Sequence, residues 1–315
     1  MTKLAVVHPT TLLGKELRER LDERQDWWDD VALLTTDEEE LGTLTEARGA
    51  AAIVGRADPI ELEGIDLAFF CGPMARNRAL LAELPNETTA VVLSPDATRG
   101  DGLPVVAGVN LEQASPGQVM ISPHPGAIAL SHLLHPLLAL EVREAVATLV
   151  QPVSMLEERA LHELFEQTRK LLNFAQPEPG VFGHQLAFNL LPLAGDADAV
   201  VGHLGAVLGE HLEVAVQIVQ GGIFHGFAVS LYARFERDPG SDALRAALKR
   251  APHVELARKP QHVGPIDAAN HPEVLVGRVH PDPRQPGGYW LWAAMDNLTR
   301  GGALNAIEIA EAVLD

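Results

Sequence analysis

The chain is poor in cysteine, in basic residues and in long apolar runs, and each shortage excludes a class of protein. One cysteine in 315 residues allows no intramolecular disulfide and no cysteine-based zinc cluster. With 24 basic against 43 acidic residues, the net charge of −19 gives no attraction for nucleic acid or an anionic membrane. No apolar run reaches the length of about 18 residues that a membrane span needs, and the N-terminus has no apolar signal-peptide core. We therefore expect a cytoplasmic protein without nucleic-acid or membrane partners.

The composition that remains is that of an ordinary globular protein. Hydrophobic residues make up 47% and charged residues 21% of the chain, and the length suggests about two domains. In the first third, short apolar runs at 3–7, 31–34, 65–70 and 90–93 alternate with helical patterns such as 10–21. This alternation predicts an α/β domain with a doubly wound parallel sheet.

The rest of the chain has a different pattern. An apolar helix is expected over 127–140, and strands over 148–153, 214–219, 228–235, 274–279 and 289–295. Ser154 and Glu157 have the spacing of a capping box, which predicts that a helix begins there. An amphipathic helix is expected over 301–314.

Three stretches carry a family resemblance: Glu163–Asn173, Gln185-Leu-Ala-Phe-Asn-Leu-Leu-Pro192 and Asp296–Ala310. Together they resemble the aspartate-semialdehyde dehydrogenase family, and most of all its Usg-type members that lack the catalytic cysteine. The resemblance implies a Rossmann-like dinucleotide-binding domain over 1–121 plus 297–315. It implies an α+β dimerisation and catalytic domain with a large mixed sheet over 122–296, and a C-terminal helix that returns to the first domain. Family members use a cysteine and NADPH to reduce an acyl phosphate to a semialdehyde.

The nucleophile that the family uses is missing here. Its Asn-Pro-Asn-Cys-Ser-Thr motif corresponds to Ser122-Pro-His-Pro-Gly-Ala127, which puts Pro125 at the cysteine position. Proline has no nucleophile and no backbone N–H to offer an oxyanion, and the neighbouring His124 is a poor substitute. The single cysteine, Cys71, ends an expected strand, where we interpret it as a small buried residue.

Other family site positions survive only in part. Gln151 matches the glutamine that orients the substrate, and His225 matches the acid/base histidine. Arg99 corresponds weakly to an arginine that contacts the substrate phosphate. The arginine that binds the substrate carboxylate is replaced by Ile218, so a carboxylate would lose its bidentate partner.

The dinucleotide loop is also degenerate. The family's Gly-x-x-Gly-x-x-Gly corresponds to His8-Pro-Thr-Thr-Leu-Leu-Gly14, where one glycine remains and is assigned to helix–strand packing. The acidic run Asp37–Glu40 would repel the 2′-phosphate of NADP, whereas Asp37 suits a ribose diol. NAD or NADP binding is therefore expected to be weak, through the remaining candidates Thr10, Thr11, Leu12, Gly14 and Asp37.

Metals and partners complete the expectations. His132 and His135 are spaced for one helical face, but no third ligand lies at matching spacing, so no metal site is predicted. The apolar segment 186–193 predicts a homodimer through the second domain, with pairing to an active paralogue as a further possibility. The leading hypothesis is a catalytically degenerate homologue with a structural, regulatory or binding role. The alternative is an NAD(P)-dependent oxidoreductase of amino-acid biosynthesis that acts on an aldehyde or acyl substrate through a rebuilt site.

Overall fold

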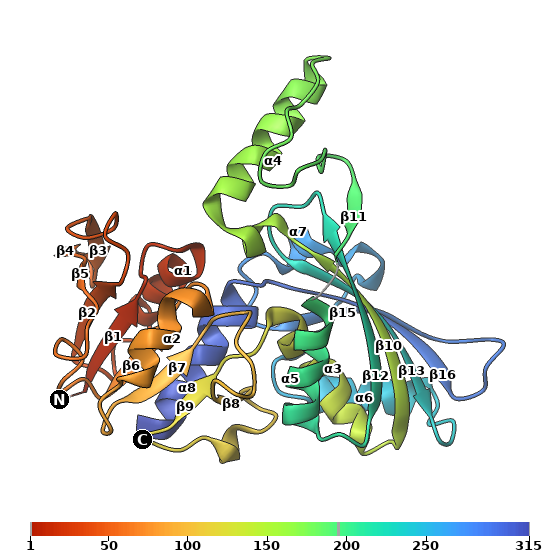
Figure 1. The fold of residues 1–315 in the computed structure, drawn as a ribbon. Coiled ribbons are helices and arrows are strands. Elements are labelled where there is room, and N and C mark those ends of the chain that lie inside the picture. Colours follow the sequence, from red (N-terminus) through yellow and green to blue (C-terminus); the bar gives the residue numbers. More distant parts are fainter. Residues whose placement is uncertain (1, 194–195, 315) are drawn as a thin grey trace. The chain divides into compact units, whose positions relative to one another are not determined.

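The computed structural model describes residues 2–193 and 196–314. The chain forms two compact units (Figure 1): residues 1–128 with 301–315, and residues 129–300. The sequence placed the divisions at 121/122 and 296/297, and the units divide a few residues later, inside helix α3 (Pro125–Leu138) and after Arg300. Of the helices in the described residues, none is long and apolar enough to cross a membrane.

The first unit is built on a parallel seven-stranded sheet in the order β5-β2-β1-β6-β7-β9-β8. Its strands are β1 (Lys3–Val7), β2 (Asp30–Thr35), β5 (Gly55–Arg56), β6 (Leu67–Phe70), β7 (Thr89–Val92), β8 (Leu103–Pro104) and β9 (Val119–Ile121). A separate hairpin, β3 (Leu44–Ala47) with β4 (Ala50–Ile53), lies between β2 and β5 in the chain. Because β2 and β6 flank β1, the chain reverses its winding direction at β1, and a ligand of this fold binds at the carboxyl ends of these strands.

Helices cover both faces of this sheet, as the doubly wound prediction requires. The strands are buried on both sides because alternate residues point to opposite faces. Leu4 and Val6 join one apolar cluster with α1 (Leu12–Asp22) and α8 (Asn305–Leu314), and Ala5 and Val7 join the other with α2 (Met74–Ala82). The predicted return of the C-terminal helix to the first unit is therefore confirmed.

The second unit holds a mixed seven-stranded sheet in the order β11-β12-β10-β13-β16-β15-β14. Its strands are β10 (Val142–Gln151), β11 (Leu190–Pro192), β12 (Glu213–Gly221), β13 (Phe227–Phe235), β14 (Val254–Leu256), β15 (Val274–Pro281) and β16 (Gly288–Met295). In Figure 1, helices α3, α5 (Asp196–Leu208) and α6 (Ser241–Arg250) lie on one face of this sheet. On the opposite face, Val146 and Trp290 are partly exposed. The predicted large mixed sheet is confirmed.

Helix α4 (Glu157–Leu172) and the chain that follows it project from this sheet (Figure 1). We call residues 157–193 the arm. The capping box predicted at its start is wrong, because Ser154 lies in a 3₁₀ turn (Val153–Leu156) and its hydroxyl bonds to Asn297 instead. Glu157, the first residue of α4, has a φ of +68°, so the chain makes a strained corner where the helix begins.

Candidate functional site

His8 lies at the carboxyl end of β1, where the first glycine of a dinucleotide loop would stand. Its φ of +58° is the left-handed conformation that a glycine adopts easily. The side chain is fully buried, and its ring approaches Gly72 beyond β6, since a Cβ built on Gly72 would lie 3.8 Å from His8 Cδ2. The imidazole ring therefore lies among the segments that end β2 and follow β6, at the carboxyl edge of the sheet.

Two hydroxyls at the end of β2 hold this ring, one from its last residue and one from the residue after it. Thr35 Oγ1 lies 3.1 Å from His8 Nδ1, and Thr36 Oγ1 lies 3.1 Å from His8 Nε2. Because the Thr35 hydroxyl donates to Glu40 at 2.8 Å, it accepts from the ring, which assigns the proton to Nδ1. Burial lowers the pKa of His8, against the opposing pull of Glu40, so the ring is neutral near pH 7. Sequence reasoning missed this role of His8, because it depends on residues 27 and 28 positions away.

The other loop candidates serve the start of α1. Thr11 is its N-cap, accepting from Gly14 N at 3.0 Å and donating to His8 O at 3.0 Å. A Cβ on Gly14 would lie 2.5 Å from His8 O, which fits the expected packing role. Thr10 and Leu12 are partly buried beside the cap. The Thr11 hydroxyl is thus already committed within the loop.

Asp37 lies in an open acidic hollow of about 530 Å³, lined by Thr36, Asp37, Glu38, Glu39 and Arg76. Its carboxylate pairs with Arg76 at 3.1 Å, and Glu40 Oε1 lies 3.9 Å from the same guanidinium. Arg76, the basic residue that lines this hollow among the described residues, is therefore already paired with carboxylates. The negative charge of this hollow disfavours a 2′-phosphate. The Asp37 carboxylate is already engaged by Arg76.

The family's nucleophile position, Pro125, is buried at the first residue of α3, after β9. The helix start is closed by His124, whose Nδ1 accepts from Gly126 N at 3.0 Å and whose carbonyl accepts from Ala127 N and Ile128 N. Pro125 itself has no N–H. The first-turn donors that could stabilise an oxyanion are therefore already used, and sequence reasoning did not anticipate this cap.

Gln151 lies at the carboxyl end of β10, beside Gln220 of the parallel strand β12. Its Nε2 donates to Gln220 Oε1 at 3.3 Å, and Gln220 Nε2 donates to Gln151 O at 3.1 Å. Gln151 is buried, and its Oε1 has no hydrogen-bond partner among the described residues. This acceptor is poised for a ligand or water.

His225 lies in the exposed turn 222–226 between β12 and β13. The turn is tied to the segment after Gln151, because Val153 N donates to Ile223 O at 2.8 Å. Asn297 Oδ1 joins both segments by accepting from Ser154 Oγ and Gly226 N. Ile218, at the family's arginine position, is 1% exposed in β12 and belongs to the core.

Arg99 is exposed in the loop after β7. His132 is buried in α3, and the structure does not bring a third ligand to it among the described residues. Glu255, His271 and Glu273 do have ligand atoms within 4.8 Å of one another. His271 Nδ1, however, accepts from Glu273 N at 3.3 Å, and its Nε2 lies 3.5 Å from Glu255 Oε2. Both ring nitrogens therefore already face groups of the protein.

Comparison with known proteins identifies the family of this chain. The family described as semialdehyde dehydrogenase, dimerisation domain, matches residues 134–300. A USG-1 protein homolog of Azotobacter vinelandii is 30% identical over 99% of this chain and 97% of its own length. An aspartate-semialdehyde dehydrogenase of Bacillus subtilis is 26% identical over 98% and 96%.

The fold agrees with these matches. The structure of a probable aspartate-semialdehyde dehydrogenase from Pseudomonas aeruginosa superposes with a TM-score of 0.90 at 28% identity, covering 98% of this chain and 97% of that one. The chain therefore belongs to the semialdehyde dehydrogenase family, among relatives named aspartate-semialdehyde dehydrogenase and USG-1 protein homologs.

Proposed function

We propose that this chain is a catalytically degenerate homologue of aspartate-semialdehyde dehydrogenase with a structural, regulatory or binding role. The start of α3 carries the proposal. The family's cysteine position is Pro125, and His124 already accepts the N–H groups of the first turn. The family reaction needs a thiolate nucleophile and donors for the tetrahedral oxyanion, and this helix start offers neither.

The dinucleotide region supports the same proposal. A pyrophosphate needs close approach of the backbone after β1, and the buried His8 ring stands there. The carboxylates of Asp37 and Glu40 beside Arg76 oppose a 2′-phosphate. NADP binding is accordingly weak or absent, and NAD is preferred if either binds.

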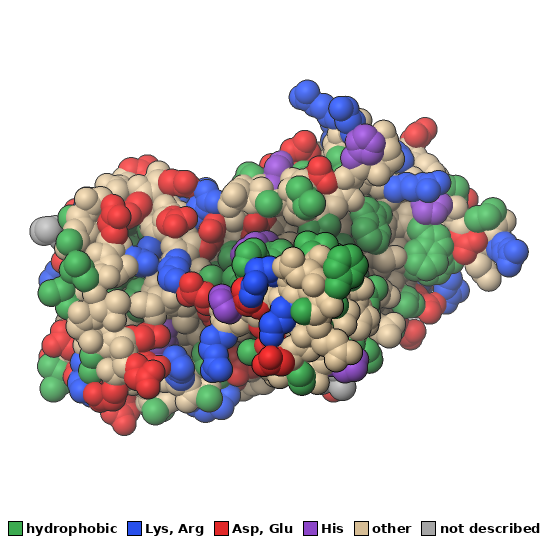
Figure 2. All heavy atoms as spheres, turned by 90° about the horizontal axis from the view of Figure 1, so that it is seen from above, with side chains coloured by type: hydrophobic (Ala, Val, Ile, Leu, Met, Phe, Trp, Pro, Cys, Tyr) green, Lys and Arg blue, Asp and Glu red, His purple; other side chains and the backbone are tan. Residues whose placement is uncertain are grey.

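The binding role that the second unit supports best is self-association. This unit carries the family's dimerisation domain, and its arm exposes large apolar side chains on the surface. Figure 2 shows hydrophobic side chains, aromatic rings among them, on the surface of the second unit. The large apolar side chains that are exposed on the arm are Phe165, Leu172, Phe174, Val181, Phe188 and Leu190. A homodimer would remove them from water, and an active paralogue with the same interface would form a mixed dimer.

The decisive experiment is the phosphate-dependent oxidation of aspartate semialdehyde, followed by NADPH absorbance. We expect no turnover above background from the natural chain. Pro125→Cys alone should also stay inactive, because Ile218 still replaces the arginine that binds the substrate carboxylate. Turnover by the natural chain that His225→Ala abolishes would overturn the proposal.

One observation favours a second candidate function, an NAD(P)-dependent oxidoreductase with a rebuilt site. The buried Oε1 of Gln151 has no hydrogen-bond partner among the described residues, and an unsatisfied buried acceptor costs about 1–3 kcal/mol. A substrate donor would satisfy it. Reduction of a panel of small aldehydes by NADH or NADPH tests this function, and Gln151→Leu should then abolish the rate while the fold is kept.

A further inference from the structure

A continuous chain of hydrogen bonds runs through the buried His8 ring at the end of β2, and the proposed function gives it no task. Thr35 Oγ1 donates to Glu40 Oε2 at 2.8 Å. The same oxygen accepts from Asp37 N at 3.0 Å and lies 3.1 Å from His8 Nδ1. The Thr35 hydroxyl therefore has its one donor and both acceptor positions filled, which fixes the His8 proton on Nδ1.

The other ring nitrogen faces a second threonine hydroxyl. Thr36 Oγ1 lies 3.1 Å from His8 Nε2 and 3.5 Å from Arg76 O, so the ring nitrogen is the nearer acceptor. His8 is fully buried, whereas Thr36 is exposed and lines the acidic hollow of about 530 Å³. A neutral imidazole at this distance can take the proton of a hydroxyl that attacks a substrate. A base shielded from water thus contacts a hydroxyl that a substrate can reach.

The order of these groups is that of an activated nucleophile. Thr36 has the nucleophile's place on Nε2, and the Thr35 hydroxyl has the orienting place on Nδ1. Glu40 stands behind Thr35, with its Oε2 3.9 Å from His8 Nδ1, where a carboxylate stabilises the ring once it is protonated.

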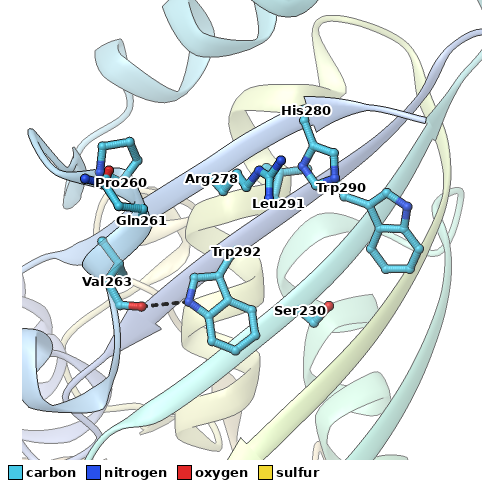
Figure 3. Close-up of a pocket in the computed structure, with 9 residues that line it drawn as sticks. All are labelled: Ser230, Pro260, Gln261, Val263, Arg278, His280, Trp290, Leu291 and Trp292. Atoms are coloured by element: carbon cyan, nitrogen blue, oxygen red, sulfur yellow. Dashed lines mark hydrogen bonds between the residues drawn. The ribbon is translucent and has the colours of Figure 1, made fainter. Parts of the chain in front are cut away.

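A hydroxyl and an imidazole in one cavity do not by themselves produce this order. Ser230 and His280 both line the cavity of the second unit that Figure 3 shows. The hydrogen bond drawn there joins Trp292 to Val263, and His280 Nδ1 has no hydrogen-bond partner among the described residues. His8, in contrast, is held at both ring nitrogens.

The walls of the acidic hollow select the charge of a substrate. Asp37, Glu38 and Glu39 line it, and Arg76 beside them is paired with Asp37 at 3.1 Å. Three carboxylates against one paired guanidinium attract a cation and repel an anion. The hollow also lies at the carboxyl end of β2, next to β1, where the winding direction of the sheet reverses and ligands of this fold bind.

We propose that Thr36 is a nucleophile that takes the acyl group of a small cationic thioester. Thr36 Oγ attacks the carbonyl carbon, so a C–O bond forms and the C–S bond breaks. The hydroxyl proton moves to His8 Nε2 and from there to the leaving sulfur, which gives O-acyl threonine and a free thiol. The proposal goes beyond the proposed function, because Pro125, Gln151 and His225 take no part in it.

Acetylthiocholine, a cationic thioester, and its uncharged carbon analogue S-(3,3-dimethylbutyl) thioacetate test the proposal. Mass spectrometry of peptides should find one acetyl group, on Thr36, and thiol release measured in parallel detects the reaction if water then removes that group. The cationic thioester should react about tenfold faster, and added salt should reduce this preference. Thr36→Val should abolish the reaction and Thr36→Ser should keep it. The control Thr43→Val, at an exposed threonine outside the hollow, should change nothing.

The pH profile tests the role of His8 as the base. Burial lowers the pKa of His8 below 6.5, Glu40 and Asp37 oppose this shift, and Arg76 adds to it. The rate should therefore be level above pH 6.5 and fall at lower pH as the ring takes up a proton. Attack by hydroxide from solution would instead rise steadily with pH. His8→Gln should remove both the acetyl group on Thr36 and the level region.

Three outcomes each reject the proposal. They are acetylation of lysines alone, a reaction that persists in Thr36→Val, and a rate that rises with hydroxide across the whole pH range. If circular dichroism shows that His8→Gln does not fold, the pH profile of the natural chain decides the role of the ring.

Discussion

A histidine in the left-handed region of the backbone is uncommon, and at position 8 it joins two roles. The φ of +58° keeps the backbone path of a glycine, while the ring bonds to Thr35 and Thr36. The backbone at position 8 therefore has the conformation of a glycine, although a large side chain stands there. A single substitution of His8 by glycine should then keep the backbone and remove the ring.

We expect His8→Gly to strengthen the dinucleotide binding that is predicted to be weak in the natural chain. Glycine adopts this φ without strain, and the space of the ring becomes available to a pyrophosphate. Calorimetry should show a gain of about tenfold or more for NAD, and a smaller gain for NADP because of the carboxylates at the acidic hollow. Thr36→Val is the control, because it removes a bond to the ring and leaves the ring in place. An unchanged His8→Gly titration contradicts this explanation.

No side chain fits at Gly14. Its Cβ position lies 2.5 Å from His8 O and 2.9 Å from Pro9 C, both backbone atoms that cannot move aside easily. Gly14→Ala or Gly14→Val should lower the free energy of unfolding in urea by about 1–3 kcal/mol or more. Gly202→Ala on the exposed surface of α5, where nothing lies within 4 Å, should instead stabilise by about 0.5–1 kcal/mol. A stable Gly14→Val variant would exclude the packing role.

His132 gives the fold a pH dependence. It is buried, both ring nitrogens lack a hydrogen-bond partner among the described residues, and burial and Arg300 hold its pKa well below 6.5. Below pH 6.5 the unfolded chain takes up a proton that the folded chain refuses, so stability is full above this pH and falls as the pH decreases.

The variant His132→Leu should remove that dependence. Between its folded pKa and pH 6.5, the natural chain should lose up to about 1.4 kcal/mol per pH unit relative to the variant. Urea unfolding at a series of pH values measures the difference. His135→Leu, exposed one turn along α3, is the control. Parallel pH curves for the natural chain and His132→Leu would contradict the assignment.

At the scale of elements, the buried parallel strands could be predicted from the sequence, whereas the exposed hairpin could not. The run 3–7 coincides with β1, and 90–93 differs from β7 by one residue. The hairpin β3–β4 was missed because its residues are largely exposed and carry no apolar alternation. Strand β10 begins at Val142, earlier than the predicted 148, because the charged residues Arg143 and Glu144 at a register shift interrupt the apolar pattern.

The candidate site divides in the same way. The missing nucleophile and the missing glycines could be recognised from the sequence alone, because they are substitutions within a motif. The closure of α3 by His124 and the packing of His8 against the end of β2 depend on rotamers and on distant partners. The expected apolar patch 186–193 was partly wrong, because Leu186 is buried in its own unit while Phe188 is 73% exposed. An apolar residue in the sequence can belong to the core or to an exposed turn, so the sequence alone could not separate Leu186 from Phe188.

At the scale of the whole molecule, the exposed apolar side chains of the arm predict a homodimer. Light scattering at low micromolar concentration should give twice the chain mass of 33.9 kDa, with an interface of about 2,000 Å² or more. Phe188→Asp should give monomer or aggregate, since an unpaired buried carboxylate costs several kcal/mol. Ile266→Asp, at a side chain that is even more exposed but lies on α7 (Pro265–Ala268) outside the arm, should leave the mass unchanged. A single-chain mass that persists for the natural protein removes the homodimer.

The burial of Cys71 has a practical consequence for such measurements. The thiol lies at the end of β6 with no exposed surface, and it is the chain's single cysteine. A maleimide dye or spin label should therefore leave the natural protein unmodified and react with one introduced residue, for example Phe174→Cys on the arm. Each copy would then carry one probe at a known position. The separation of two such probes would report directly on how neighbouring arms are placed.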